Sequence, residues 1–197
     1  NILIMKRIIL LIILSVSTSF YTKAATTFVH PGGTTTLTDL ERIKTKVLAK
    51  EHPWIDAWNL MIQDYKASSS YTAGPQPDVA YQDGTRQRCA RDAQAAYYNI
   101  LEWYVTGDES HAKCAVNILN AWASAINDTV KGQLFQLPID IMVQTAEVVR
   151  IYSGWSDNDK EKFKQCCLKY FYPACKNFLG YCGSWPGWDG PANSRSE

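Results

Sequence analysis

The sequence predicts an all-α protein assembled from antiparallel helical hairpins. Apolar residues recur at intervals of three and four along most of the chain, which is the spacing of one face of an α-helix. Helix-starting and helix-stopping residues divide these stretches at short connections. No stretch shows the strict two-residue alternation that a half-buried strand requires. Because long helices with short connections pack as antiparallel neighbours, we expect hairpins and essentially no sheet.

The N-terminal residues have the layout of a secretory signal. A basic segment, Met5–Arg7, precedes the unbroken apolar run Ile8–Leu14, and small residues follow. We therefore assign residues 1–24 to a signal peptide, with Asn1–Ile4 upstream of the true start, and place the folded domain at 25–197. The apolar run is too short for a stable membrane anchor, so no membrane span is expected after cleavage. The mature protein is predicted to be periplasmic or secreted.

Two helices are predicted in the first third of the domain. Thr38 can cap a helix whose third residue is Glu41, a capping-box arrangement, and this helix should run to about Lys50. Pro53 is well placed to open the second helix, because proline is tolerated at a first helical position. Residues 68–78 contain glycine and prolines and read as a loop.

The third and fourth helices form the clearest hairpin in the sequence. Thr85–Val105 contains neither glycine nor proline and is rich in alanine, and Gly107 supplies a left-handed stop. Asp108 can cap the next helix, which should run to about Ile126. Arg91 and Asp92 lie side by side on the third helix, where we expect a structural ion pair with another helix, because charged side chains are rarely buried without a partner.

The last third predicts two more helices and a terminal loop. The fifth helix should begin at Pro138 and close at Gly154, and Ser156 should cap the sixth. Pro173 interrupts the sixth helix, and residues 180–197 read as loop. A bundle, a solenoid and an (α/α) toroid are all compatible with this run of hairpins.

Composition narrows the class of function. The net charge of +1 gives no basic surface for neutralising phosphates, so we exclude nucleic acid as a partner. The chain has 7 Trp and 11 Tyr, which suit both a helical core and stacking on sugar rings.

The cysteines and histidines give no metal-binding pattern. There are six cysteines and three histidines, with no Cys-x-x-Cys pair, and the histidines are scattered, so no metal site is predicted. Cys89 with Cys114, or Cys175 with Cys182, could form disulfides in an oxidising compartment. Free buried thiols are the equal alternative.

Several stretches, in their order and spacing, resemble one enzyme family over nearly the whole mature chain. They are His30-Pro31-Gly32, Leu37–Lys44, Glu51-His52-Pro53-Trp54, Cys89–Asn99, Thr106-Gly107-Asp108, Asn117–Trp122 and Ala146-Glu147. Together these resemble the N-terminal portion of the alginate lyase family of polysaccharide lyases, in its Bacteroidetes-type form.

The resemblance implies a fold, a reaction and a partner. The fold would be part of an incomplete (α/α) toroid whose inner helices line a cleft, and the partner an anionic uronate polysaccharide. The reaction would be β-elimination, in which the uronate carboxylate is neutralised, a base removes the C5 proton and an acid protonates the leaving oxygen. No cofactor and no metal are implied.

The resemblance also predicts where site residues lie. The family's carboxylate-neutralising Asn corresponds to Ser184 here, or to Asn193 if the register slips. The family's His, Arg and catalytic Tyr would lie beyond Glu197, so we expect this chain to be catalytically incomplete.

Four further residues are candidate substrate-binding groups. Trp185 and Trp188 lie in a segment rich in glycine and proline, where contact with sugar is a natural role for an exposed aromatic ring. Gln136 lies at the mouth of the fifth helix and either faces the cleft or serves only the helix entry. Tyr97 is adjacent to Tyr98, so at most one of the two rings faces the core squarely.

Two other classes of function remain as alternatives. A non-catalytic helical carbohydrate-binding or helical-repeat module would share the helical pattern, although the unequal helix lengths show no fixed repeat period. A glycoside hydrolase would require two carboxylates flanking a cleft, and Asp189 is the only acid near the loop aromatics.

Overall fold

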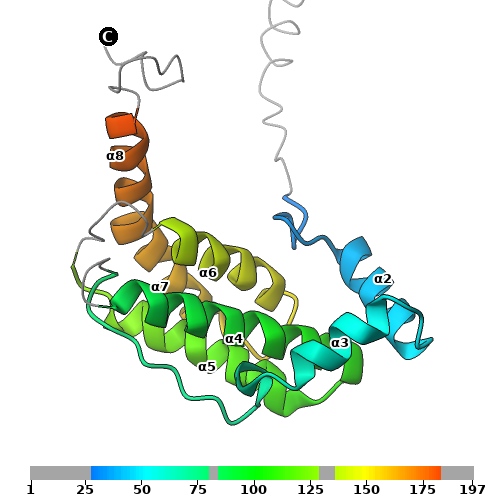
Figure 1. The fold of residues 1–197 in the computed structure, drawn as a ribbon. Coiled ribbons are helices and arrows are strands. Elements are labelled where there is room, and N and C mark those ends of the chain that lie inside the picture. Colours follow the sequence, from blue (N-terminus) through cyan, green and yellow to red (C-terminus); the bar gives the residue numbers. More distant parts are fainter. Residues whose placement is uncertain (1–27, 80–83, 129–135, 183–197) are drawn as a thin grey trace, which may run out of the picture.

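The computed structural model describes residues 28–79, 84–128 and 136–182, and every regular element in those ranges is helical (Figure 1). The predicted all-α class is therefore confirmed. The elements are α2 (Leu37–Leu48), α3 (Trp54–Ile62), the 3₁₀ turn η1 (Tyr65–Ala67), α4 (Thr85–Thr106), α5 (Glu109–Ala125), α6 (Gln136–Val149), α7 (Asp157–Cys166), the π-helical turn η2 (Cys167–Phe171) and α8 (Tyr172–Cys182).

Helix α4 is the centre of the described fold. It packs most extensively against α5 and α6, and it also contacts η1 and α2. Alanines on its buried faces, such as Ala93 and Ala96, are fully enclosed and let the neighbouring helices approach closely. Figure 1 shows α4, α5, α6 and α7 side by side, with α2 and α3 at one end and α8 extending from the other. The larger toroid stays a prediction.

The α4–α5 hairpin forms as its local residues predict. Gly107 has a φ of 80°, a left-handed conformation that glycine adopts without steric cost, and it ends α4. The side chain of Asp108 then accepts a hydrogen bond from the backbone N–H of Ser110 and caps α5. Ser156 likewise caps α7 by accepting from the N–H of Asp159, as predicted.

The N-terminal cap of α2 differs from the prediction. Thr36, not Thr38, is the N-cap, and its partner in the capping box is Asp39, not Glu41. Both pairs have the same spacing, so the local pattern alone cannot choose between them. The carboxylate of Asp39 also accepts from Arg42, which gives the earlier box an extra contact.

Two prolines lie inside helices that they were expected to begin or interrupt. Helix α6 begins at Gln136, so Pro138 occupies its first turn, where the missing N–H has no intrahelical partner anyway. Pro173 is the second residue of α8, directly after the π-helical turn η2, and the helix continues to Cys182. The wider π turn accommodates the change in hydrogen-bond register before the proline. The predicted loop therefore starts later than residue 180.

Neither of the two predicted disulfides, Cys89–Cys114 and Cys175–Cys182, forms, because Cys89, Cys114 and Cys175 are free thiols. Burial raises the pKa of Cys114 to about 11, so this thiol stays protonated. The free cysteines in the described ranges are Cys89, Cys114, Cys166, Cys167 and Cys175.

A buried carboxylate on α4 holds the segment that follows η1. Asp92 is 2% exposed and forms no ion pair with another helix, contrary to the prediction. Instead it accepts hydrogen bonds from the Tyr71 hydroxyl (2.7 Å), the backbone N–H of Gly74 (2.9 Å) and the Trp122 indole N–H (2.7 Å). Three donors replace the cation that a buried carboxylate would otherwise need.

A second buried side chain of α4 holds the start of the same segment. The amide nitrogen of Asn99 donates to the carbonyl oxygens of Ala95 (2.9 Å), Lys66 (3.0 Å) and Ser68 (3.3 Å). Asn99 and Asp92 are two helical turns apart and so project from the same face of α4. We call residues 65–74 the anchored segment, since both side chains bind it.

Candidate functional site

The structure describes only some of the predicted site residues. Tyr97 lies on α4 and is half-buried. Gln136 is the first residue of α6, but its side chain lies outside the described part. The remaining candidates also lie outside the described residues and stay predictions; they are Ser184, Trp185, Trp188 and Asn193.

The hydroxyl of Tyr97 meets the extended segment that precedes α2. We call residues 28–36 the N-terminal arm. The Tyr97 hydroxyl lies 3.0 Å from the Thr35 hydroxyl, 62 residues earlier in the chain. Tyr97 is therefore already engaged by a polar partner at the surface where the arm crosses α4.

The arm is also fastened to α6. The Gln144 side-chain oxygen accepts from the backbone N–H of Thr34 (2.9 Å) and from its hydroxyl (3.3 Å). Gly33 permits this approach, because a Cβ there would lie 1.9 Å from the same Gln144 oxygen. His30 Nδ1 lies 2.7 Å from a Glu147 carboxylate oxygen, and both side chains are partly exposed.

A shallow pocket of about 300 Å³ lies where the arm meets α6. It presents an imidazole, a carboxylate and an amide beside the apolar side chain of Val143. Such a mixture of a few polar groups on an apolar wall suits a sugar, whose hydroxyls need donors and acceptors and whose ring faces are apolar. The lining residues are Phe28, Val29, His30, Gly32, Gly33, Val143, Gln144 and Glu147.

The structure does not bring Gln136 and this pocket together. Gln136 precedes Gln144 by eight residues on α6, which corresponds to about 12 Å along the helix axis. The residues that do gather near the arm, Gln144 and the pair His30–Glu147, were not predicted as site residues. The only signal was that His30 and Glu147 both belong to stretches of the family resemblance.

A second polar cluster joins α4 to α5. His111 Nδ1 lies 2.8 Å from the side-chain oxygen of Asn99, and His111 Nε2 lies 3.5 Å from a Glu102 carboxylate oxygen. Because the Asn99 amide nitrogen donates elsewhere, its oxygen accepts from His111, which places the proton on Nδ1. The other carboxylate oxygen of Glu102 is buried with no hydrogen-bond partner in the described structure.

Both titratable groups in this cluster favour their neutral forms. Burial, reinforced by the nearby carboxylate of Asp108, raises the pKa of Glu102 to about 7. Burial lowers the pKa of His111, and Asp108 opposes this shift. A buried neutral pair of this kind makes the stability of the fold depend on pH.

The Glu102→Gln variant is expected to be more stable than the wild type at about pH 8, by about 1 kcal/mol, and equally stable at about pH 4, below the ordinary pKa of this carboxyl. The folded-state pKa of Glu102 is raised, so its stabilising contribution is complete below its ordinary pKa and is lost as the pH rises towards 7. Glutamine keeps the neutral shape and removes this loss. Urea unfolding at both pH values measures the effect.

The control is Asp140→Asn, at an exposed position of α6, and its effect on the free energy of unfolding should be small at both pH values. An equal change in the free energy of unfolding of Glu102→Gln at both pH values would show that Glu102 does not titrate as described.

Within the described ranges, no cluster of three or more His, Cys, Asp or Glu side chains has the arrangement of a metal site. None of the helices described combines the length and the apolar character needed to cross a bilayer.

Comparison with known proteins identifies a family for most of the chain. The family model described as Alginate lyase matches residues 36–173, which is well over half of the sequence. No curated protein and no solved structure gives a significant match. The matched range begins within the arm and contains α2 to η2.

Proposed function

Since the chain belongs to the alginate lyase family, we propose that it is an exported polysaccharide lyase acting on a uronic-acid-containing polysaccharide, alginate or a related polymer. The observation that carries the proposal is the family match over residues 36–173. The pocket between the arm and α6 supports it, because a few polar groups on an apolar wall suit a sugar. Export rests on the secretory layout of residues 1–24 and places the protein in the periplasm or outside the cell.

The chemistry that this proposal requires is β-elimination. Neutralising the uronate carboxylate acidifies the C5 proton, a base removes that proton, and an acid protonates the departing glycosidic oxygen. In this scheme Ser184 or Asn193 neutralises the carboxylate, and Trp185 and Trp188 stack on sugar rings. The α-helical hairpins form part of an (α/α) toroid, and Tyr97 lies on the wall of its cleft.

The proposal is tested with the product of the complete gene and a panel of alginate, polymannuronate and glucuronan. Each elimination leaves a C4–C5 double bond conjugated to the carboxylate, so a rise in ultraviolet absorbance reports cleavage. A rise with a uronate polymer but not with a neutral polysaccharide supports a lyase. Absence of any rise from a well-folded protein contradicts it, and binding without a rise would favour the non-catalytic carbohydrate-binding module instead.

The Tyr97→Phe variant is expected to raise the KM for the cleaved polymer by roughly two- to tenfold, with little change in kcat. This is the range that corresponds to one lost hydrogen bond of about 0.5–1.5 kcal/mol. Steady-state absorbance kinetics measure both parameters. Tyr172→Phe, on an exposed tyrosine of α8, is the control and should leave KM unchanged.

A Thr35→Val variant separates two roles for Tyr97. If Tyr97 serves only to hold the arm, Thr35→Val removes the same hydrogen bond and raises KM equally. If the Tyr97 hydroxyl contacts the polysaccharide, Tyr97→Phe raises KM more than Thr35→Val does. An unchanged KM in Tyr97→Phe would remove Tyr97 from the site.

A further inference from the structure

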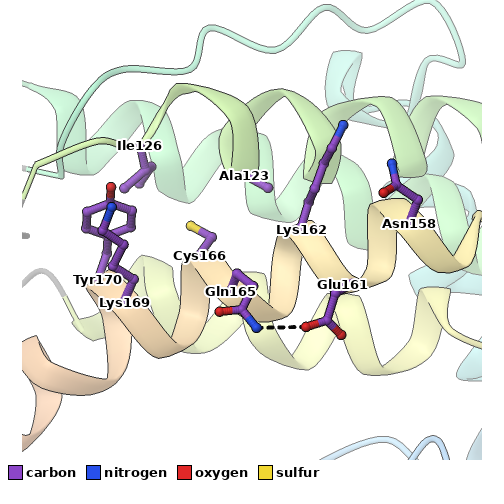
Figure 2. Close-up of a pocket in the computed structure, with 9 residues that line it drawn as sticks. All are labelled: Ala123, Ile126, Asn158, Glu161, Lys162, Gln165, Cys166, Lys169 and Tyr170. Atoms are coloured by element: carbon purple, nitrogen blue, oxygen red, sulfur yellow. Dashed lines mark hydrogen bonds between the residues drawn. The ribbon is translucent and has the colours of Figure 1, made fainter.

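A second groove lies between α5 and α7, on elements that do not contribute to the pocket beside the arm. It has a volume of about 320 Å³. Its floor is made of short or buried side chains: Ala123 from α5, Ile126 directly after α5, and Cys166 from α7. Figure 2 shows these three between longer side chains at the two ends of the groove. Because these side chains are short or buried, they do not fill the groove.

Each end of the groove carries a lysine. Lys162 and Asn158 stand at one end, and Lys169 and Tyr170 stand at the other (Figure 2). The two lysines are seven residues apart on a continuous helical stretch, which separates them by about 10 Å along the axis. A chain with repeated charges can contact both lysines at this spacing.

Neither lysine is held by a close carboxylate in the described structure. Lys162 Nζ lies 4.0 Å from Asp159 Oδ1, and the Lys162 side chain is 61% exposed, which makes this a weak surface pair. Lys169 Nζ lies 5.0 Å from the centre of the Tyr170 ring. Both ammonium groups therefore remain accessible to an incoming anion.

The one acidic residue lining the groove is already neutralised by its neighbours. Glu161 accepts hydrogen bonds from Gln165 Nε2 (2.7 Å) and Lys164 Nζ (3.1 Å). In Figure 2 its bond to Gln165 lies on the side of α7 away from α5. Lys162 and Lys169 thus determine the charge of the groove, which is positive although the whole chain has a net charge of only +1.

Tyr170 supplies the remaining element of a sugar site. Its ring is half-buried beside Ile126 at the end of the groove. Aromatic rings of this kind offer an apolar face to the C–H groups of a sugar, while Asn158 offers an amide to its hydroxyls. A cation at each end, an aromatic ring and an amide are groups that suit a carboxylated sugar chain.

We propose that the α5–α7 groove is a second, non-catalytic binding site for a uronate oligosaccharide. The charged, repeating character of the ligand follows from the groove, and its identity as a uronate rests on the proposed function. Such a site would hold the polymer on the protein between cleavage events without contacting the reacting bond.

The test compares two double variants that remove the same charge from the same helix region. Lys162→Gln with Lys169→Gln removes both lysines of the groove, whereas Lys160→Gln with Lys176→Gln removes two lysines of the same helical stretch that neither line the groove nor contact Glu161. Calorimetric titration with a uronate oligosaccharide, and with a neutral oligosaccharide of equal length, measures binding to each. Thermal unfolding checks that both variants are folded.

The groove variant is expected to bind the uronate oligosaccharide about tenfold more weakly at this site, the effect of two exposed charge contacts. The control variant should bind as the wild type does, and the neutral oligosaccharide should not bind the groove. Cleavage of short oligosaccharides should be unchanged in the groove variant. Equal losses in both double variants, or no loss in either, would overturn the proposal.

The result for the groove can be distinguished from the result for the proposed function. If no polymer is cleaved but the groove variant loses binding, the groove stands and the lyase assignment fails. If polymers are cleaved and binding is identical in all forms, the lyase stands and the groove is not a binding site.

Discussion

Replacing Asp92 with alanine is expected to lower the free energy of unfolding by about 4 kcal/mol, the largest effect of any single substitution proposed for this protein. The carboxylate is 2% exposed and accepts from Tyr71, Gly74 and Trp122. Alanine would leave three donors without an acceptor, the buried Trp122 indole N–H and two partly buried groups, at about 1–3 kcal/mol each before relaxation. Burial and the bond to Asp92 raise the pKa of Tyr71, so its hydroxyl remains a donor.

Urea unfolding followed by circular dichroism gives the free-energy difference. The control is Asp157→Ala on α7, whose side chain is fully exposed and whose loss should cost less than about 1 kcal/mol. A cost for Asp92→Ala as small as that of the control would mean that water or rearrangement satisfies all three donors.

The Asn99→Leu variant is expected to lower the free energy of unfolding by about 3 kcal/mol. Leucine has a similar volume but cannot donate to the carbonyls of Lys66 and Ser68 or accept from His111 Nδ1. It therefore leaves the Lys66 carbonyl and the His111 imidazole N–H, both partly buried, without these partners. Hydrogen exchange should also accelerate in the anchored segment, because its fastening to α4 is lost.

The control for this variant is Asn59→Leu, at an exposed position of α3. Combining Asn99→Leu with Asp92→Ala tests whether both side chains act on one segment. If they do, the double variant loses less stability than the two single losses added together, because the anchored segment is already released. Full additivity would indicate that the two anchors act independently.

The helix boundaries that could be predicted from sequence are those set by neighbouring residues. Gly107 with Asp108, and Ser156 with Asp159, end and begin helices through contacts within a single turn. Such contacts depend only on local spacing, so the sequence displays them directly.

Boundaries and partners that depend on tertiary contacts could not be predicted. The pattern at Thr38 and Glu41 competes with an equally spaced one at Thr36 and Asp39, and only the arm's course decides. The sequence predicted a charged partner for Asp92. Its carboxylate instead accepts hydrogen bonds from an indole N–H, a phenol hydroxyl and a backbone N–H. Two of these donors come from the anchored segment and one from α5, and their spacing follows no sequence period.

The same reason limits what could be predicted of the site. Tyr97 was selected because two adjacent tyrosines cannot both face a core, yet its partner Thr35 comes from a segment without helical periodicity. His30 and Glu147 meet across 117 residues. The predicted roles of Trp185 and Trp188 depend on residues outside the described ranges and stay predictions.

The way the anchored segment is held has a consequence for how this surface can diverge. Its fastening to Asn99 uses the carbonyls of Lys66 and Ser68, and one of its bonds to Asp92 uses the backbone N–H of Gly74. A carbonyl is the same group whichever residue carries it, so the information that places the segment resides largely on α4. The side chains at positions 66 and 68 can therefore be replaced by others. Such replacements change the outer surface while the backbone path beneath them is preserved.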